Sequence, residues 1–97
     1  MKYSFEWDPK KALINTRKHG ITFEQASKIF KDPIALTIYD ENSSETEEDR
    51  WITLGQVDNK HYLVVVHSYR GQSKEEITIR LISARPATKY EIKQYQG

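Results

Sequence analysis

Cysteine is absent from this chain of 97 residues, and glycine and proline are scarce, with four and three residues. The lack of cysteine excludes disulfides, a thiol nucleophile and a cysteine-ligated zinc site, and it fits a reducing, cytoplasmic location. The glycines are too dispersed to form a glycine-rich phosphate loop, so nucleotide-driven chemistry is not expected. They are Gly20, Gly55, Gly71 and Gly97.

Long apolar runs are missing as well. No run approaches the roughly 20 residues that span a bilayer, and the first residues lack the apolar stretch of a signal peptide. The three histidines, His19, His61 and His67, do not have the close spacing of a metal site. We therefore expect one small cytoplasmic domain over residues 1–97 that uses no metal and no cofactor.

Charge is unevenly distributed along the chain. The net charge is +1, yet six of the fourteen acidic residues lie between positions 40 and 49, and the rest of the chain has a net charge of +7. A basic body suits a protein that binds a polyanion such as RNA. An ordinary solvated surface with an acidic loop explains the same distribution of charge equally well. The six acidic residues are Asp40, Glu41, Glu45, Glu47, Glu48 and Asp49.

Two helices are expected near the N-terminus, after a short strand at residues 3–7. The first helix should run from Pro9 to His19, because Asp8 is suited to cap it and Gly20 to end it in a left-handed conformation. The second helix should begin directly after this stop.

The second helix has a capping-box start, Thr22 with Gln25, and should end at Asp32-Pro33. Thr88 and Glu91 predict a last helix in the same way. The order strand, helix, helix, four strands, helix indicates an α+β domain with a mostly antiparallel sheet of four to five strands. The four later strands are expected at residues 34–39, 51–57, 61–69 and 76–83.

Hairpin geometry predicts a cluster of cations on the sheet. A two-residue turn at 58–59 would place Arg50 opposite His67 on one face. A four-residue turn between the next two strands would add Arg80, opposite Val65, to the same face. A loop one residue shorter or longer would send Arg80 to the other face.

These residue types are sufficient to cut RNA without a metal. A base takes the proton of the 2′-hydroxyl, an acid protonates the leaving 5′-oxygen, and cations stabilise the charge on phosphorus. Arg50, Arg80 and Arg85 are suited to charge stabilisation, and His19 or His67 to acid or base work. For any one of them, a structural role is the competing interpretation.

Other residues could bind RNA directly. Lys18 and His19, at the end of the first helix, could hold a phosphate, although they could equally serve as plain helix caps. Tyrosines among basic residues could stack on unpaired bases, with core packing as the alternative. These tyrosines are Tyr62, Tyr69, Tyr90 and Tyr95.

The residues named so far, taken together in order, resemble the BrnT toxins over nearly the whole chain. No single motif is decisive, whereas the ordered set is specific. The matching pieces are Phe5-Glu6-Trp7-Asp8-Pro9-Lys10, Asn15, Lys18-His19-Gly20-Ile21, Phe23, Ala26, Phe30, Asp32-Pro33, Arg50, Gly55, Arg80 to Arg85 and Ala87-Thr88.

The resemblance implies a RelE-like ribonuclease fold and a toxin of a type II toxin–antitoxin system that cleaves RNA without metal, inhibiting translation and growth. It also implies a BrnA-type antitoxin whose ribbon-helix-helix domain binds operator DNA, so that this chain meets DNA only through its partner. The alternative is a non-catalytic binding module or co-repressor that acts only through that antitoxin.

The resemblance also ranks positions for the site. Arg50 and Arg80 come first, followed by Lys18, His19 and Arg85, with Glu48 as a possible base beside Arg50. His67 joins the catalytic candidates on hairpin geometry, and Tyr69 and Tyr95 join Lys18 and Arg85 as RNA-binding candidates.

Overall fold

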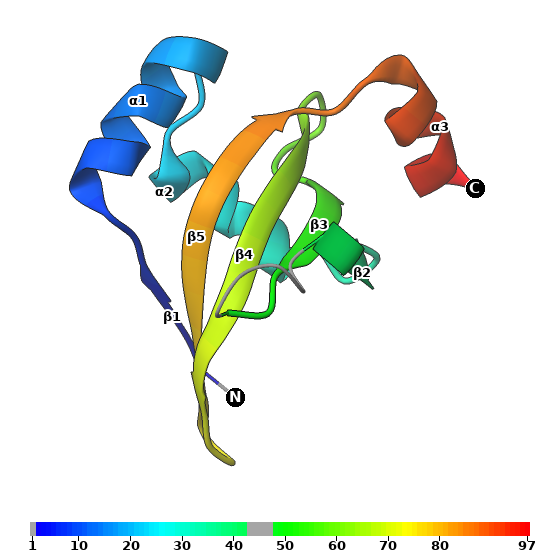
Figure 1. Cartoon of the computed structure of the whole chain (residues 1–97). Helices are drawn as coiled ribbons and strands as arrows, with labels where there is room; N and C mark the ends of the chain where they lie inside the picture. Colours follow the sequence, from blue (N-terminus) through cyan, green and yellow to red (C-terminus); the bar gives the residue numbers. More distant parts are fainter. Residues whose placement is uncertain (1, 43–47) are drawn as a thin grey trace.

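The computed structural model describes residues 2–42 and 48–97, and its helices and strands build one sheet with helices on both sides (Figure 1). The strand order is β1-β5-β4-β3-β2, with β1 parallel to β5 and the other pairs antiparallel. The predicted α+β class is confirmed, and Glu45 and Glu47 of the acidic loop lie outside the described residues. The elements are β1 (Lys2–Glu6), α1 (Pro9–His19), α2 (Phe23–Ala26), the 3₁₀ helix η1 (Ser27–Lys31), β2 (Leu36–Tyr39), β3 (Trp51–Gln56), β4 (Tyr62–Gln72), β5 (Glu76–Pro86) and α3 (Lys89–Gln96).

Helix α1 begins and ends where the sequence predicts. The Asp8 carboxylate accepts a hydrogen bond of 2.8 Å from the backbone N–H of Lys10. Gly20 has φ of 71°, and its N–H donates to the carbonyl of Thr16 at 2.8 Å. A side chain is strained in that left-handed conformation, so glycine lets the helix stop there.

Asn15 attaches α1 to the sheet. It is buried, its Nδ2 donates to the carbonyl of Ala84 at 2.9 Å, and its Oδ1 accepts from the N–H of Ala84 at 3.0 Å. The same Nδ2 donates to the carbonyl of Ile21 at 3.3 Å. One side chain therefore joins α1, the turn after it and β5 through backbone groups that would otherwise be buried without partners.

The second helix differs from its prediction in form. Thr22 and Gln25 make the expected capping box, but the α-helix lasts only from Phe23 to Ala26 and continues as the 3₁₀ helix η1 up to Asp32. The Ser27 hydroxyl donates to the carbonyl of Glu24 at 2.8 Å. Such side-chain bonds compete with the α-helical pattern and favour a tighter turn.

The core lies between the sheet and the layer of α1, α2 and η1, whereas α3 covers part of the opposite face (Figure 1). None of the described helices combines the length and apolar character that crossing a membrane requires. The core residues are Ile21, Phe23, Ala26, Ile29, Leu63, Val65, Ile79, Leu81 and Ala84.

The predicted pairing of β3 with β4 was wrong by one residue. Trp51, not Arg50, lies opposite His67, because the turn has three residues and Val57 donates to the carbonyl of His61 at 3.0 Å. The Asp58 carboxylate stabilises this three-residue turn, because its Oδ1 accepts hydrogen bonds from the backbone N–H groups of Lys60, at 2.7 Å, and His61, at 2.9 Å. A one-residue slip turns every β3 side chain to the other face.

The predicted pairing of β4 with β5 was wrong as well. Ala84 lies opposite Val65, whereas Arg80 lies opposite Ser68. Two irregularities interrupt the pairing: Ile82 is an extra residue of β5 opposite Val66 and His67, and Arg70 is an extra residue of β4 between Tyr69 and Gly71. Strand β4 runs on to Gln72 before it turns. Arg80 consequently does not share a face with His67.

Candidate functional site

Three arginines from separate parts of the chain line one polar depression of about 520 Å³. Arg50 directly precedes β3, Arg70 lies near the end of β4, and Arg80 lies on β5. Arg80 is the last β5 residue that pairs with β1. Beyond it β5 has no partner strand on that side, and the depression extends there to the first turn of α1. The other lining residues are Asp8, Lys11, Glu48, Leu81 and Ile82.

Glu48 and Arg70 form an ion pair in this depression, with Nη1 and Oε2 2.6 Å apart. Arg70 Nε lies 3.5 Å from a carboxylate oxygen of Glu6 on β1. Partial burial by itself would raise the pKa of Glu48. The hydrogen bond from Arg70 and the charges of Arg70 and Arg80 outweigh burial and lower the pKa of Glu48. Glu48 is therefore a carboxylate at neutral pH.

Arg50 and Arg80 have unused hydrogen-bond donors. Neither side chain makes a hydrogen bond or ion pair with another residue in the described ranges 2–42 and 48–97, and Arg50 Nε is buried there without a partner. A buried polar group without a partner carries a free-energy cost of about 1–3 kcal/mol. A phosphate in the depression would supply acceptors to both guanidinium groups.

His67 does not belong to this depression. Its side chain is fully buried under η1, with Nε2 2.7 Å from the hydroxyl of Thr53 and the ring 4.8 Å from that of Phe30. Burial lowers the pKa of His67 to about 4, so the imidazole is neutral at neutral pH. A role for it in acid–base catalysis stays a prediction that this location does not support.

Lys18 and His19 lie at the far end of α1 from the depression. Lys11, which lines the depression, is seven residues before Lys18, which corresponds to about 10 Å along the helix. Tyr69 packs its ring against Trp51 and His67 on the helix-covered face. None of these three candidates meets the arginines.

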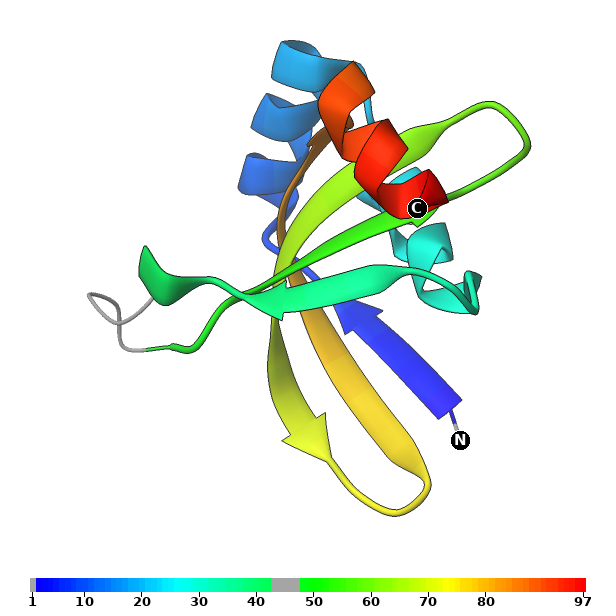
Figure 2. The same ribbon diagram turned by 90° about the vertical axis from the view of Figure 1, so that its right-hand side faces the viewer.

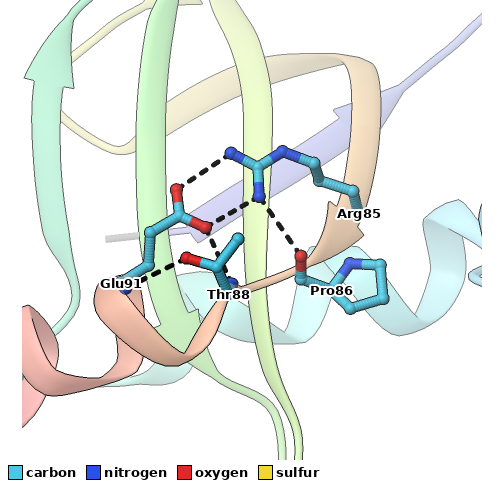
Figure 3. Close-up of polar contacts among 4 residues, drawn as sticks. All are labelled: Arg85, Pro86, Thr88 and Glu91. Atoms are coloured by element: carbon cyan, nitrogen blue, oxygen red, sulfur yellow. Dashed lines mark hydrogen bonds and ion pairs between the residues drawn. The ribbon is translucent and has the colours of Figure 1, made fainter.

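Arg85 is held by Glu91 of α3, as Figure 3 shows. Two hydrogen bonds of 2.8 and 2.9 Å join the guanidinium to the carboxylate, and Arg85 also donates to the carbonyl of Pro86 at 3.2 Å. The pair lowers the pKa of Glu91 to about 2 and raises the pKa of Arg85. Glu91 also accepts from the N–H of Thr88, so Arg85 serves to anchor α3.

Tyr95 is also used to attach α3. Its hydroxyl donates to Oδ2 of Asp32 at 2.6 Å, which raises the pKa of Tyr95 to about 12. The ring packs on Tyr62, 5.3 Å away. Of the nine predicted site residues, the structure thus brings together only Arg50, Arg80 and Glu48.

Sequence reasoning missed Arg70, Lys11 and Asp8 as members of the site. The sequence shows Arg70 as a cation in a predicted strand region, two residues after Ser68, but its meeting with Arg80 depends on the irregular pairing of β4 with β5. Lys11 and Asp8 are found only through the close approach of α1 to β5. No local pattern in the sequence signals either contact.

Comparisons with known proteins identify the family. The model of a family described as the ribonuclease toxin BrnT of type II toxin–antitoxin systems matches residues 7–91. A crystal structure of the Brucella abortus ribonuclease toxin BrnT is similar in fold, with a TM-score of 0.61, 20% identity, and coverage of 92% of this chain and 100% of that chain. No curated protein sequence matches. The chain belongs to the BrnT family of ribonuclease toxins of type II toxin–antitoxin systems.

Proposed function

We propose that this toxin cuts RNA in the arginine depression, as an endoribonuclease that needs no metal ion. The observation that carries the proposal is the pair Arg50 and Arg80, whose donors have no partner among the described residues and which lie beside Glu48 and Arg70. Cations that are already in place can stabilise the charge that develops on a phosphate during cleavage.

In the proposed reaction the 2′-oxygen of the RNA attacks the adjacent phosphorus, and the bond from phosphorus to the 5′-oxygen breaks. Glu48 accepts the proton of the 2′-hydroxyl, and water in the open depression protonates the leaving oxygen. Arg50 and Arg80 bind the phosphate oxygens. When Arg70 moves from Glu48 to the phosphate, the pKa of Glu48 rises, because Arg70 is a main cause of its lowering, and Glu48 becomes a stronger base.

Replacement of the arginines tests this site. We expect Arg50→Ala and Arg80→Ala each to slow single-turnover cleavage of a labelled RNA by about 100-fold or more, since one lost charge-stabilising donor costs that much in other enzymes. Arg17→Ala, which removes an exposed cation of α1, serves as the matched control and should cleave normally. Unchanged cleavage by Arg50→Ala and Arg80→Ala would overturn the assignment.

The same assay tests the metal-free chemistry, because excess EDTA should leave the rate of cleavage unchanged. Loss of activity in EDTA that added Mg²⁺ restores would contradict this part of the proposal.

We also propose that a BrnA-type antitoxin with a ribbon-helix-helix domain neutralises this toxin in the cytoplasm, where RNA cleavage stops translation and growth. Operator DNA would then be bound only through the antitoxin. Induced expression should arrest growth, co-expression of the antitoxin encoded beside this gene should restore it, and Arg50→Ala with Arg80→Ala should abolish arrest while antitoxin affinity stays the same. A non-catalytic co-repressor would instead show no toxicity at verified protein levels.

A further inference from the structure

The outer strand β2 exposes apolar side chains at an open edge of the sheet. It pairs only with β3 among the described strands, and its sequence, Leu-Thr-Ile-Tyr, has no charged residue. Ile34 is 63% exposed, Leu36 45% and Ile38 64%. Edge strands are usually protected by charge, proline or a covering element, so a bare apolar edge marks a site for strand pairing.

Residues of β2, β3, β4 and α3 line a groove of about 260 Å³ beside this edge. The ribbons of β2 and α3 both face the viewer in Figure 2. Leu36 and Ile38 point into it, on the same face as their cross-strand neighbours Leu54 and Ile52. Val64, Glu91 and Gln94 complete the lining. An added strand could pair with the free backbone of β2 and place alternate apolar side chains in this groove.

We propose that an extended segment of the antitoxin binds here, as an additional strand on β2. This rests on the antitoxin partner put forward above. Asp40 and Glu41 follow β2 directly, and Asp49 is joined to this end of the strand by a 2.9 Å hydrogen bond from the Tyr39 hydroxyl. The segment that fits is therefore apolar at alternate positions and carries Lys or Arg beside the acidic end of β2.

Charge favours the antitoxin over a second copy of the toxin. A second β2 would bring the same uncharged strand and the same acidic end, Asp40 and Glu41, and no cation within the strand to pair with them. Asp40, Glu41 and Asp49 do not line the arginine depression, and we assign them to the selection of a basic partner strand.

The position of β2 also links the partner to the RNA site. The N–H of Asp40 donates to the carbonyl of Arg50 at 2.9 Å, and Tyr39 pairs with Trp51, the residue after Arg50. A strand bound on the free edge of β2 would be separated by β2 alone from the chain that carries Arg50 into the depression. The antitoxin would thereby inhibit RNA cleavage from the edge of the sheet at β2. Its basic residues would lie near the path by which RNA reaches the depression.

Ile38→Lys tests the proposal against a matched control, Ile14→Lys. Both side chains are more than 60% exposed, but Ile14 lies on α1, away from the groove. In calorimetric titrations with the purified antitoxin encoded beside the gene, Ile38→Lys should bind about 30-fold or more weakly, as expected for a central interface residue. Ile14→Lys should bind like the wild type, and both variants should cleave RNA at the wild-type rate.

Hydrogen exchange on the wild-type toxin supplies a test that needs no variant. Binding of the antitoxin should slow exchange of amides in β2, residues 36–39, more than in α1. Unchanged affinity of Ile38→Lys, or unprotected β2 amides in the complex, would overturn the docking proposal. So would a toxin dimer that Ile38→Lys dissociates while antitoxin affinity is unaltered. Cleavage is measured separately, so failure of the ribonuclease proposal would be recognised on its own.

Discussion

The surroundings of His67 determine its protonation. Thr53 from β3, Phe30 from η1 and Tyr69 from its own strand surround the ring, and Nδ1 has no partner among the described residues. No charged side chain among these neighbours could stabilise an imidazolium ion. Burial therefore lowers the pKa of His67 from its ordinary value of 6.5 to about 4.

This shift predicts loss of stability in mild acid. The unfolded chain binds a proton at His67 below about pH 6.5, whereas the folded chain does so only near pH 4, so the contribution is complete above pH 6.5 and is lost as the pH falls. The difference corresponds to about 3 kcal/mol. Urea unfolding of the wild type should show much of this decrease between pH 7 and pH 5.

The control for this prediction is His67→Gln, which keeps a polar atom for Thr53 and removes the titrating group. Its free energy of unfolding should be nearly constant between pH 7 and pH 5. An equal pH dependence in wild type and variant would show that another group is responsible.

At the scale of elements, α3 has little buried packing to hold it on the sheet. None of its residues is buried. Its capping box, the Arg85–Glu91 pair and the Tyr95–Asp32 hydrogen bond attach it instead. An element held by a few polar contacts can open without global unfolding.

Tyr95→Phe should therefore loosen α3 selectively. The lost hydrogen bond to Asp32 is worth about 1 kcal/mol, which corresponds to about fivefold faster exchange of the amides of residues 92–97. Global stability and the exchange of α1 should change little. Tyr90→Phe is the matched control, because Tyr90 lies on the same helix, is 70% exposed and makes no hydrogen bond with the described residues. Equal effects of the two variants would count against the anchoring role of Tyr95.

At the scale of the whole molecule, the net charge of +1 conceals a separation of charge. Residues 40–49 hold six of the fourteen acidic residues, while Arg50, Arg70 and Arg80 gather around one depression. RNA affinity should follow these local cations and not the net charge, because counterions are released where phosphates are bound.

Salt titration checks this view. Three phosphate contacts to single-stranded RNA predict that the logarithm of affinity falls with that of salt with a slope of about −2, or about 20-fold between roughly 50 and 200 mM. Arg70→Gln should make the slope less steep by about 0.7, whereas Arg17→Gln on the exposed side of α1 should not change it. A slope near zero in the wild type would contradict phosphate binding in the depression.

The helices were predictable because their signals are local. Asp8, Gly20 and the Thr22–Gln25 capping box act within a few residues, and the structure uses each of them as expected. The α+β class and the family resemblance also came from the sequence by itself, since they depend on the order of elements and motifs. Hairpin geometry placed Arg50 and Arg80 on one face, but it did so through a register that the structure contradicts. The position of Glu48 beside Arg50 came from the resemblance and not from local geometry.

Only the tertiary structure decided which side chains share a face. The Asp58 turn takes three residues where two were expected, and two irregularities shift β4 against β5. Each alternative differs by one residue of chain, yet one residue reverses the face of a strand. This separated His67 from the arginines and brought Arg70 to them, because sheet register depends on packing across the whole fold.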